Sequence, residues 1–420
     1  MKCQTCLIPR RILFGSSGKM RVKISPDGKK LSYLAPVNNI LNIWVKTIGS
    51  DDDRVITDDK ERSIRFYFWA QNNKDILYLQ DKKGKENWNI YKVSIKTGEI
   101  TNLTPYEHIQ ASIITIDKKF PDEILIQMNR ENPVATDVYR LNLKSSRLQM
   151  AAKNPGRIKW WVKDGKLNVS AGVGPASDGK DELIVRKGEN EWERIDEWGY
   201  EDSFSNSAIC ITRDGKYIYL IDSRNSNTGR LLKINIQTGE KEVLFHDPRY
   251  DFDGWIDFSR NPDSILIHPD SYEIEAITCN REKKEWVILD KNLEDDFEAI
   301  KKLSEGEFHV ISRDSLNEKW IICFDCDNES HKYYLFDRTA RRGEFLFYSR
   351  PELNEYIFSK METISFTARD GLKINGYISY PPGDKRKNLP LVLYVHGGPW
   401  SRDTWGFNPV TQWITNRGYV

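Results

Sequence analysis

The stretch Ser25-Pro26-Asp27-Gly28-Lys29, continued by the short apolar run KLSYL (30–34), is the first of seven similar units in this chain. Each unit begins with a turn built on Asp, Asn, Gly, Pro or Lys and continues as a short strand. With Asp27 and Asp314 as the first and last markers, six intervals span 287 residues, or 47.8 residues each. The other six units are AQNNKDILYL (70–79), DKKFPDEILI (117–126), VKDGKLNV (162–169), TRDGKYIYLI (212–221), SRNPDSILI (259–267) and SRDSLNEKWIIC (312–323).

A second element follows each unit, and most of these elements alternate apolar and polar residues around a turn, which is typical of a β-hairpin. In two of them, Lys96-Thr97-Gly98-Glu99 and Gln237-Thr238-Gly239-Glu240, glycine occupies the position that must tolerate a positive φ. The seven second elements cover 42–48, 89–100, 137–148, 181–195, 230–245, 272–288 and 332–347.

Seven units of about four short strands predict a mainly β fold, a seven-bladed β-propeller over residues 20–348 that follows an N-terminal segment, 1–19. One blade has no means of burying both of its faces, so neighbouring blades must stack. The 13 Trp, 19 Tyr and 17 Phe supply large apolar areas for packing between sheets. A β-sandwich or a solenoid would have a similar density of strands, but the count of seven favours the propeller.

Composition excludes several classes of protein. The 420 residues fit one large repeat domain plus a smaller one, and 30% charged with 39% hydrophobic residues is typical of a folded globular chain. Lys and Arg total 63 against 62 Asp and Glu, and this balance argues against a nucleic-acid-binding surface. The sequence has neither an apolar run of about 18 residues nor an apolar stretch typical of a signal peptide. We therefore expect a cytoplasmic protein without a nucleic-acid or membrane partner.

Six cysteines are too few for a disulfide scaffold, but two C-x-x-C pairs occur, Cys3/Cys6 and Cys323/Cys326. Together they could supply four thiolates to zinc. However, Cys323 lies in the alternating stretch WIICFDCD (320–327), which is typical of a strand, and Cys3 and Cys6 lie in the N-terminal segment. We therefore favour structural roles for these cysteines and expect no metal and no cofactor.

The repeat ends near Tyr348, and residues 349–360, which show no clear period, are predicted to be a linker. Asp370-Gly371 is a turn signal between two β-rich runs, 362–368 and 372–380. The continuous apolar run LPLVLYV (389–395) predicts a strand buried on both faces, as in an α/β sheet. Residues 361–420 are therefore predicted to form a second, smaller domain.

The apolar run ends at His396-Gly397-Gly398-Pro399-Trp400. A strand that ends in H-G-G and opens into a loop is typical of the oxyanion hole of α/β-hydrolases. A tetrahedral oxyanion needs backbone N–H donors, and glycine lets the backbone approach it closely. We predict an oxyanion-hole loop at His396, Gly397, Gly398 and Pro399, in which His396 is structural rather than a general base. Downstream, a short helix is predicted with Asn408 as its N-cap, Pro409 at its first position and Gly418 at its end.

In this order the segments resemble the prolyl oligopeptidase family of serine peptidases, and above all its branch of acylaminoacyl-peptidases and dipeptidyl-peptidase-like enzymes. The resemblance covers essentially the whole chain; its HGGPW segment is specific, whereas SPDGK units occur in many propellers. The residues that carry it are Ile8-Pro9-Arg10, Leu13-Phe14-Gly15, Ser25 to Lys29, His396 to Trp400, Arg402-Asp403, Trp405-Gly406-Phe407-Asn408 and Asn416-Arg417-Gly418-Tyr419.

The resemblance implies that a propeller caps a C-terminal α/β-hydrolase domain, and that short peptides are hydrolysed through an acyl-enzyme by a Ser-Asp-His triad held between the two. We find no G-x-S-x-G nucleophile elbow in the sequence, so no catalytic triad residue is assigned. The chain looks like the front part of such an enzyme, with about one quarter of the hydrolase domain over 361–420. We expect this chain alone to be inactive as a peptidase.

Two other readings stay open. The first is a non-catalytic propeller that binds peptides or a protein partner, because propellers host many functions. The second is complementation, in which a separate chain that carries the triad pairs with the edge at 389–395. Without neighbouring strands that edge would expose unpaired backbone groups, so we expect 361–420 to be poorly ordered or sticky in isolation.

Acidic residues could hold the amino terminus of a peptide, but none stands out in the sequence. Glu294-Asp295-Asp296 is a candidate only as any acidic loop is, and we predict that such charge runs are solvated loops between strands.

Overall fold

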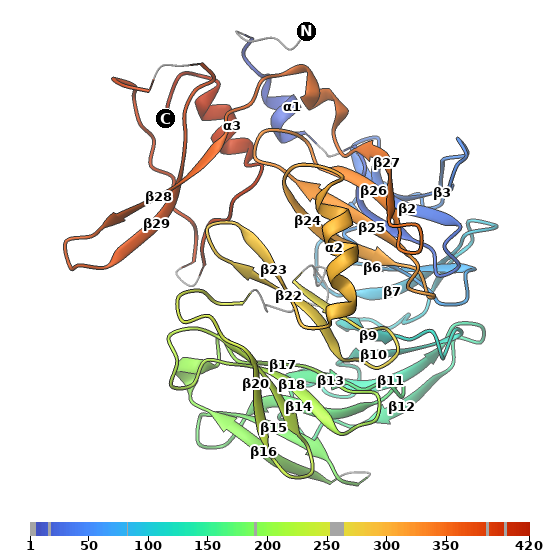
Figure 1. The fold of residues 1–420 in the computed structure, drawn as a ribbon. Coiled ribbons are helices and arrows are strands. Elements are labelled where there is room, and N and C mark those ends of the chain that lie inside the picture. Colours follow the sequence, from blue (N-terminus) through green and yellow to red (C-terminus); the bar gives the residue numbers. More distant parts are fainter. Residues whose placement is uncertain are drawn as a thin grey trace.

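The structure, a computed structural model, describes residues 6–15, 18–81, 83–188, 191–252, 264–383, 386–398 and 401–420. Between Met20 and Tyr348 its strands form seven antiparallel sheets in chain order, arranged as the blades of a propeller (Figure 1). The predicted mainly β, seven-bladed architecture is therefore confirmed.

Each blade is a meander in which consecutive strands pair, and we number the blades one to seven along the chain. Blades one to three contain β1 (Met20–Ile24), β2 (Lys30–Val37), β3 (Ile40–Thr47), β4 (Arg54–Val55), β5 (Phe66–Trp69), β6 (Asp75–Gln80), β7 (Asn89–Ser94), β8 (Ile100–Asn102), β9 (Ala111–Ile116), β10 (Glu123–Met128), β11 (Asp137–Asn142) and β12 (Leu148–Ala152). Blades four and five contain β13 (Trp160–Lys163), β14 (Val169–Pro175), β15 (Asp181–Arg186), β16 (Trp192–Trp198), β17 (Ser207–Ile211), β18 (Tyr217–Asp222), β19 (Arg230–Asn235) and β20 (Lys241–Phe245). Blades six and seven contain β21 (Ile265–Ile267), β22 (Ile274–Asn280), β23 (Lys284–Ile288), β24 (Glu307–Arg313), β25 (Lys319–Asp325), β26 (Lys332–Asp337) and β27 (Arg342–Tyr348).

The acidic residue of the repeated turn has a local structural role. In blade one the Lys29 N–H donates to Asp27 Oδ1 (3.1 Å), the Lys30 N–H donates to Ser25 Oγ (2.8 Å), and Gly28 adopts a φ of 67°. In blade four the Lys166 N–H donates to Asp164 Oδ1 (2.9 Å), and in blade seven the Glu318 N–H donates to Asp314 Oδ1 (2.8 Å). Short polar side chains that accept from the backbone two to five residues later fix such turns, which explains why the repeat is visible in the sequence.

Apolar side chains pack between neighbouring blades. The ring closes between blades seven and one, where Val22, Leu31 and Tyr33 pack against Ile321 and Leu335. No described sheet combines strands from both ends of the ring, so side-chain burial and a few hydrogen bonds close it. Burial of each large apolar side chain stabilises the fold by about 1.5–3 kcal/mol.

Blade six departs from the repeat, because helix α2 (Glu294–Lys301) follows its third strand. Leu293, which directly precedes the helix, lies on the same face as Phe297 and Ile300, and all three side chains are buried. The prediction that Asp295 and Asp296 belong to a solvated loop is wrong. The spacing i, i+4, i+7 of the apolar residues marks an amphipathic helix within this acidic stretch.

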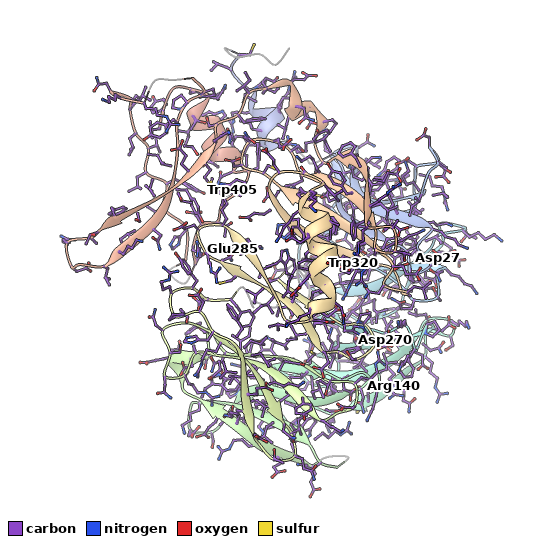
Figure 2. The ribbon with its side chains drawn as sticks, viewed as in Figure 1. Asp27, Arg140, Asp270, Glu285, Trp320 and Trp405 are labelled. Carbon is purple, nitrogen blue, oxygen red and sulfur yellow. The ribbon has the colours of Figure 1, made fainter. Side chains whose placement is uncertain are left out.

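The strand directions define two ends of the propeller. The turn that follows the innermost strand of each blade lies at one end, which we call the turn end. The connections that enter the innermost strands lie at the other, which we call the open end. In Figure 2, Asp27 and Asp270 at the turn end lie to the right, and Trp405 at the open end lies to the left.

The chain after the propeller lies at the open end (Figure 1). The short helix η3 (Pro351–Glu355) leads to a hairpin of β28 (Met361–Thr367) and β29 (Lys373–Ser379), which matches the predicted pair of β runs. Helix α3 (Pro409–Thr415) packs against the N-terminal helix α1 (Arg10–Phe14). Within the described residues, no helix combines the length and the apolar character needed to cross a membrane.

Strand-to-strand connections also contain two short helices, η1 (Tyr200–Asp202) and η2 (Lys291–Leu293). Helix η1 lies between blades four and five, and η2 directly precedes α2.

Candidate functional site

Contacts with blades six and seven hold the C-terminal segment against the open end. The Tyr377 hydroxyl donates to the Glu282 carbonyl (2.8 Å), in the turn between β22 and β23. The Arg402 guanidinium donates to the carbonyls of Asn280 (2.7 Å) and Arg281 (3.0 Å) in the same turn. The segment that carries the predicted oxyanion-hole loop is therefore fixed over one side of the propeller's open end.

A buried glutamine completes this attachment at blade seven. Gln412 on α3 donates from Nε2 to the carbonyls of Asp327 and Ser359 (both 2.8 Å), and its Oε1 accepts from the Ser359 N–H (2.8 Å). The N-cap of α3 is as predicted, because Asn408 Oδ1 accepts from the N–H groups of Val410 and Thr411.

The predicted oxyanion-hole loop follows this attached segment only in part. His396, Gly397 and Gly398 are exposed, and Gly398 has a φ of 147°, a conformation that glycine allows. His396 Nδ1 lies 2.7 Å from the Gly397 carbonyl oxygen. Pro399 lies outside the described residues. The backbone of the loop is thus open to a ligand, and its role as an oxyanion hole stays a prediction.

The prediction that 389–395 forms a strand buried on both faces is wrong for this chain. Leu391, Leu393 and Val395 are 66%, 79% and 68% exposed. The run is extended, and two hydrogen bonds join it to the last residue, from the Val392 N–H to Val420 O (2.9 Å) and from the Val420 N–H to Pro390 O (2.8 Å). A buried strand needs neighbours on both sides and helices over both faces, and the described residues do not supply them.

The acidic candidate from the sequence, Glu294-Asp295-Asp296, lies at the turn end, far from this site in the topology. Asp296 is buried and pairs with Arg338 Nη2 (2.7 Å), and Asp295 pairs with Arg341 Nη2 (2.8 Å). These carboxylates attach α2 to the β26–β27 turn, so the structure gives them a structural role.

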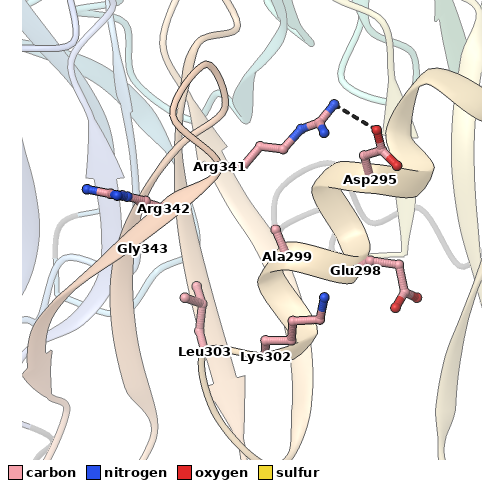
Figure 3. A pocket seen from close by; sticks show the side chains of 8 residues that line it. All are labelled: Asp295, Glu298, Ala299, Lys302, Leu303, Arg341, Arg342 and Gly343. Carbon is pink, nitrogen blue, oxygen red and sulfur yellow. Dashed lines mark ion pairs between the residues drawn. The ribbon is translucent and has the colours of Figure 1, made fainter.

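A groove opens beside α2, between this helix and β27 (Figure 3). Its lining carries both signs of charge, with Glu298 and Lys302 side by side on α2 and Arg342 across from them, so it offers no clear preference for a charged ligand. The residues that line it are Asp295, Glu298, Ala299, Lys302, Leu303, Arg341, Arg342 and Gly343.

At the open end, η1 presents an acidic pair that the sequence reasoning missed. Glu201 is exposed, and Asp202 Oδ1 accepts from the Ser223 hydroxyl (2.8 Å). Tyr200 and Phe204 are 68% and 41% exposed, and their ring centroids lie 5.4 Å apart. The sequence does carry a signal for this pair. Two adjacent acidic residues lie between two aromatic residues, in a connection that leads into an innermost strand.

Another adjacent acidic pair at the open end, Asp58-Asp59, is already engaged by the protein. Asp58 lies 3.2 Å from Lys60 Nζ, and Asp59 Oδ1 accepts from Gln80 Nε2 (3.0 Å). Glu201 and Asp202 are therefore the better candidates for a positively charged group of a ligand.

Ionisable groups of blade seven lie where the propeller meets the C-terminal segment. Burial raises the pKa of Glu307 to about 7 and lowers the pKa of His309 to about 3. Asp325 lies 3.2 Å from His331 Nε2, and although burial opposes protonation, this hydrogen bond raises the pKa of His331. Asp325 also accepts from the Phe407 N–H (3.4 Å). The Asp325 carboxylate therefore lies at the contact between blade seven and the C-terminal segment.

The cysteine pairs do not form a common centre in the described part of the chain. Cys323 and Cys326 are buried free thiols, and Cys326 Sγ donates to the Glu305 carbonyl (3.0 Å). Cys6 is disulfide-bonded, and Cys3 lies outside the described residues. No group of three or more His, Cys, Asp or Glu side chains suited to a metal ion occurs in the described ranges.

Known proteins resemble this chain over nearly all of its length. Dipeptidyl aminopeptidase BIII of Pseudoxanthomonas mexicana is 31% identical over 424 aligned positions, which cover 99% of this chain. Dipeptidyl peptidase family member 6 of Caenorhabditis elegans is 27% identical and covers 98% of this chain. The chain spans about 60% of the length of these curated relatives. No protein-family model matches the chain.

Solved structures share the fold at low sequence identity. A puromycin-hydrolyzing peptidase of Mycobacterium tuberculosis superposes with a TM-score of 0.66 at 12% identity, covering 95% of this chain and 65% of its own. A puromycin hydrolase superposes with a TM-score of 0.65 at 13% identity, covering 100% of this chain and 68% of its own. One of two prolyl endopeptidases superposes with a TM-score of 0.62 at 11% identity, covering 97% of this chain and 61% of its own.

The described seven-bladed propeller, followed by the segment that carries the H-G-G sequence, has the fold that these solved structures share. The curated relatives are named as dipeptidyl peptidases and the solved structures as peptidases or puromycin hydrolases, so the resemblance to the prolyl oligopeptidase family predicted from the sequence is confirmed.

Proposed function

We propose that the chain is the propeller and the first part of the hydrolase domain of a serine peptidase that releases dipeptides from the amino ends of short peptides. The supporting observation is that the predicted oxyanion-hole loop, His396 to Gly398, belongs to a segment attached to the same open end that presents Glu201 and Asp202. A peptide placed between them would have its amino terminus near carboxylates and its scissile carbonyl near backbone N–H donors.

The acidic pair would bind the amino terminus of the substrate and so determine which peptide bond lies at the oxyanion-hole loop. An exopeptidase that removes a dipeptide must hold the α-ammonium at a fixed distance from the reacting carbonyl. A carboxylate that accepts charge-assisted hydrogen bonds from an ammonium is suited to this role, and exposed Tyr200 and Phe204 can contact apolar side chains.

The nucleophile and the rest of the triad are not assigned to any residue of this chain, which contains no G-x-S-x-G. We propose that the remaining strands of the sheet, from further residues of the protein or from a separate chain, pair with the extended run 391–395. The chain alone would then bind peptides without cleaving them. A cytoplasmic location stays a prediction from the sequence.

Binding of a short fluorescent peptide, measured by anisotropy, tests the acidic pair. We expect acetylation of the peptide's amino terminus to weaken binding about tenfold, because it removes a charged hydrogen bond worth about 1.5–3 kcal/mol. The double variant E201Q/D202N should lose this preference, whereas the control variant D58N should keep it. Equal affinity for free and acetylated peptides would contradict the role of the pair.

A serine-directed probe separates the two readings of catalysis. The proposal predicts that the 420-residue chain neither takes up a fluorophosphonate probe nor hydrolyses a dipeptide anilide, while the natural protein does both. If the natural protein has the mass of this chain, 49.1 kDa, and stays unlabelled, the non-catalytic peptide-binding propeller becomes the better description.

A further inference from the structure

The repeated turns meet across the propeller axis. These turns follow the innermost strands, so all of them lie at the turn end, opposite the C-terminal segment. Several of their side chains bond to blades that are not neighbours. The turns comprise residues 25–29, 70–74, 117–122, 164–168, 212–216, 268–273 and 314–318.

Asp117 of blade three is the centre of these bonds. Its Oδ2 accepts from Arg213 Nη2 of blade five (2.6 Å) and from the Tyr272 hydroxyl of blade six (2.8 Å). Arg213 also donates to the Gly165 carbonyl of blade four (2.5 Å), and its guanidinium lies 4.8 Å from the centroid of the Tyr272 ring. Asp117 is 3% exposed, so four blades are joined around a buried carboxylate.

Lys118 extends the network to the far side of the ring. Its Nζ donates to Asp270 Oδ2 of blade six (2.8 Å) and to the Ser315 carbonyl of blade seven (2.9 Å). In a closed ring of seven blades, three steps are the largest separation, and blade three is three steps from blade six and three from blade seven. Bonds between such blades must cross the axis.

Ser315 links the remaining two blades. Its N–H donates to the Pro26 carbonyl of blade one (2.9 Å), and its hydroxyl donates to Gln71 Oε1 of blade two (2.6 Å). All seven blades therefore contribute to one network, which we call the axial floor. It consists of Pro26, Gln71, Asp117, Lys118, Gly165, Arg213, Asp270, Tyr272 and Ser315.

The charged side chains that bond across the axis are paired. Arg213 pairs with Asp117 and Lys118 pairs with Asp270. The Lys163 ammonium of blade four lies beside them, 5.7 Å from the centroid of the Tyr272 ring. These side chains occupy the space that a chain threading along the axis would need.

We propose that the axial floor closes the propeller at its turn end, so that a peptide reaches the space facing the predicted oxyanion-hole loop only from the open end. This inference rests on the proposed function for its ligand. It deepens that function, because a chamber with one closed end admits the end of a chain and excludes a polypeptide threaded through the axis.

A covalent lock on the floor tests the proposal in the 420-residue chain. In the double variant K118C/D270C, bis-maleimidoethane should join the two positions, as detected by intact mass and peptide mapping, because the side chains they replace are in contact across the axis. The single variant K118C should form only the mono-adduct. Absence of the cross-link would overturn the closed floor.

The association rate of a short peptide with a free amino terminus then tests the route of entry. We expect the locked protein to bind this probe at the same rate as the unlocked double variant, within a factor of two. A polyethylene glycol chain of about 5 kDa on V134C, a 90% exposed position at the open end, should slow binding several-fold. A tenfold or greater loss of rate on locking the floor would overturn the proposal.

The two failures are distinguishable. A protein that cross-links across the floor but binds no peptide in either state would support the closed floor and contradict the proposed function.

Discussion

At the level of single residues, the contact between blade seven and the C-terminal segment contains two titratable groups, Glu307 and His309. Burial raises the pKa of the first and lowers the pKa of the second. The Glu307 carboxyl also accepts a hydrogen bond from the Lys284 N–H (2.7 Å), which acts on its pKa in the opposite direction to burial. His309 is held neutral by burial. The pH therefore affects the stability of this part of the propeller through groups that no motif revealed.

The sign for Glu307 follows from its raised pKa. The unfolded chain releases the proton near pH 4.5 and the folded chain near pH 7, so the contribution to stability present below pH 4.5 is lost as the pH rises through 7. For His309 the sign is reversed, since its pKa is lowered from 6.5 to about 3, and stability is lost as the pH falls through that window.

Replacing Glu307 with glutamine should therefore stabilise the chain more at high pH than at low pH. We expect the difference in free energy of unfolding between E307Q and the unmodified chain to grow by about 2 kcal/mol from pH 5 to pH 8, less than the full shift implies because the side chain is partly exposed. Urea unfolding at several pH values measures this difference. E305Q, at an exposed carboxylate two residues away, is the matched control variant, and a flat profile for E307Q would contradict the assignment.

At the level of elements, α3 is the connection between the propeller and the segment that carries the predicted loop. Its N-cap and its last turn were readable from Asn408, Pro409 and Gly418, because caps depend on local hydrogen bonds. Its docking was not readable, because Gln412 bonds to Asp327 and Ser359, which are 85 and 53 residues away.

Loss of the Gln412 amide should detach α3. In Q412M the carbonyls of Asp327 and Ser359 and the Ser359 N–H lose their partner, at a cost of about 1–3 kcal/mol for each buried group. We expect hydrogen exchange of the α3 amides to rise about 100-fold, which corresponds to about 3 kcal/mol. The variant T411A, at the neighbouring position, keeps the Gln412 hydrogen bonds, and its α3 amides should exchange at the rate of the unmodified chain. An equal rise in exchange rate in both variants would contradict the role of Gln412.

At the level of the whole molecule, the apolar run 391–395 is exposed along most of its length, and its backbone is an edge open to pairing. Exposed apolar strands with free edges template association with other chains. The earlier expectation that 361–420 is sticky in isolation stays a prediction, and the exposure of this run gives it a physical basis.

Charge on this run should reduce self-association. We expect the double variant L391K/L393K to shift the chain towards monomer in sedimentation velocity at concentrations where the unmodified chain associates, with no change in the melting temperature of the propeller. Leu316, which is 72% exposed at the turn end, provides the control, and L316K should leave association unchanged. Equal behaviour of L391K/L393K and the unmodified chain would show that the run does not mediate association.

The sequence by itself determined the propeller, its seven units, the hairpin of 361–379 and the cap of α3. Each of these rests on contacts within a few tens of residues, such as the turn bonds made by Asp164 and Asp314, so composition and spacing record them. The H-G-G loop was found in the same way, by a motif whose chemistry is carried by adjacent backbone groups.

Only the tertiary structure decided which end of the propeller each loop occupies. Strand direction separates the acidic stretch at α2 from Glu201 and Asp202, although both are runs of adjacent acidic residues in the sequence. Ring closure brings Lys118 to Asp270 across 152 residues. The exposure of 391–395 also depended on its neighbours, because the same apolar run is buried when strands flank it and open when they do not. Long-range contacts are set by how the blades pack, and no local pattern encodes them.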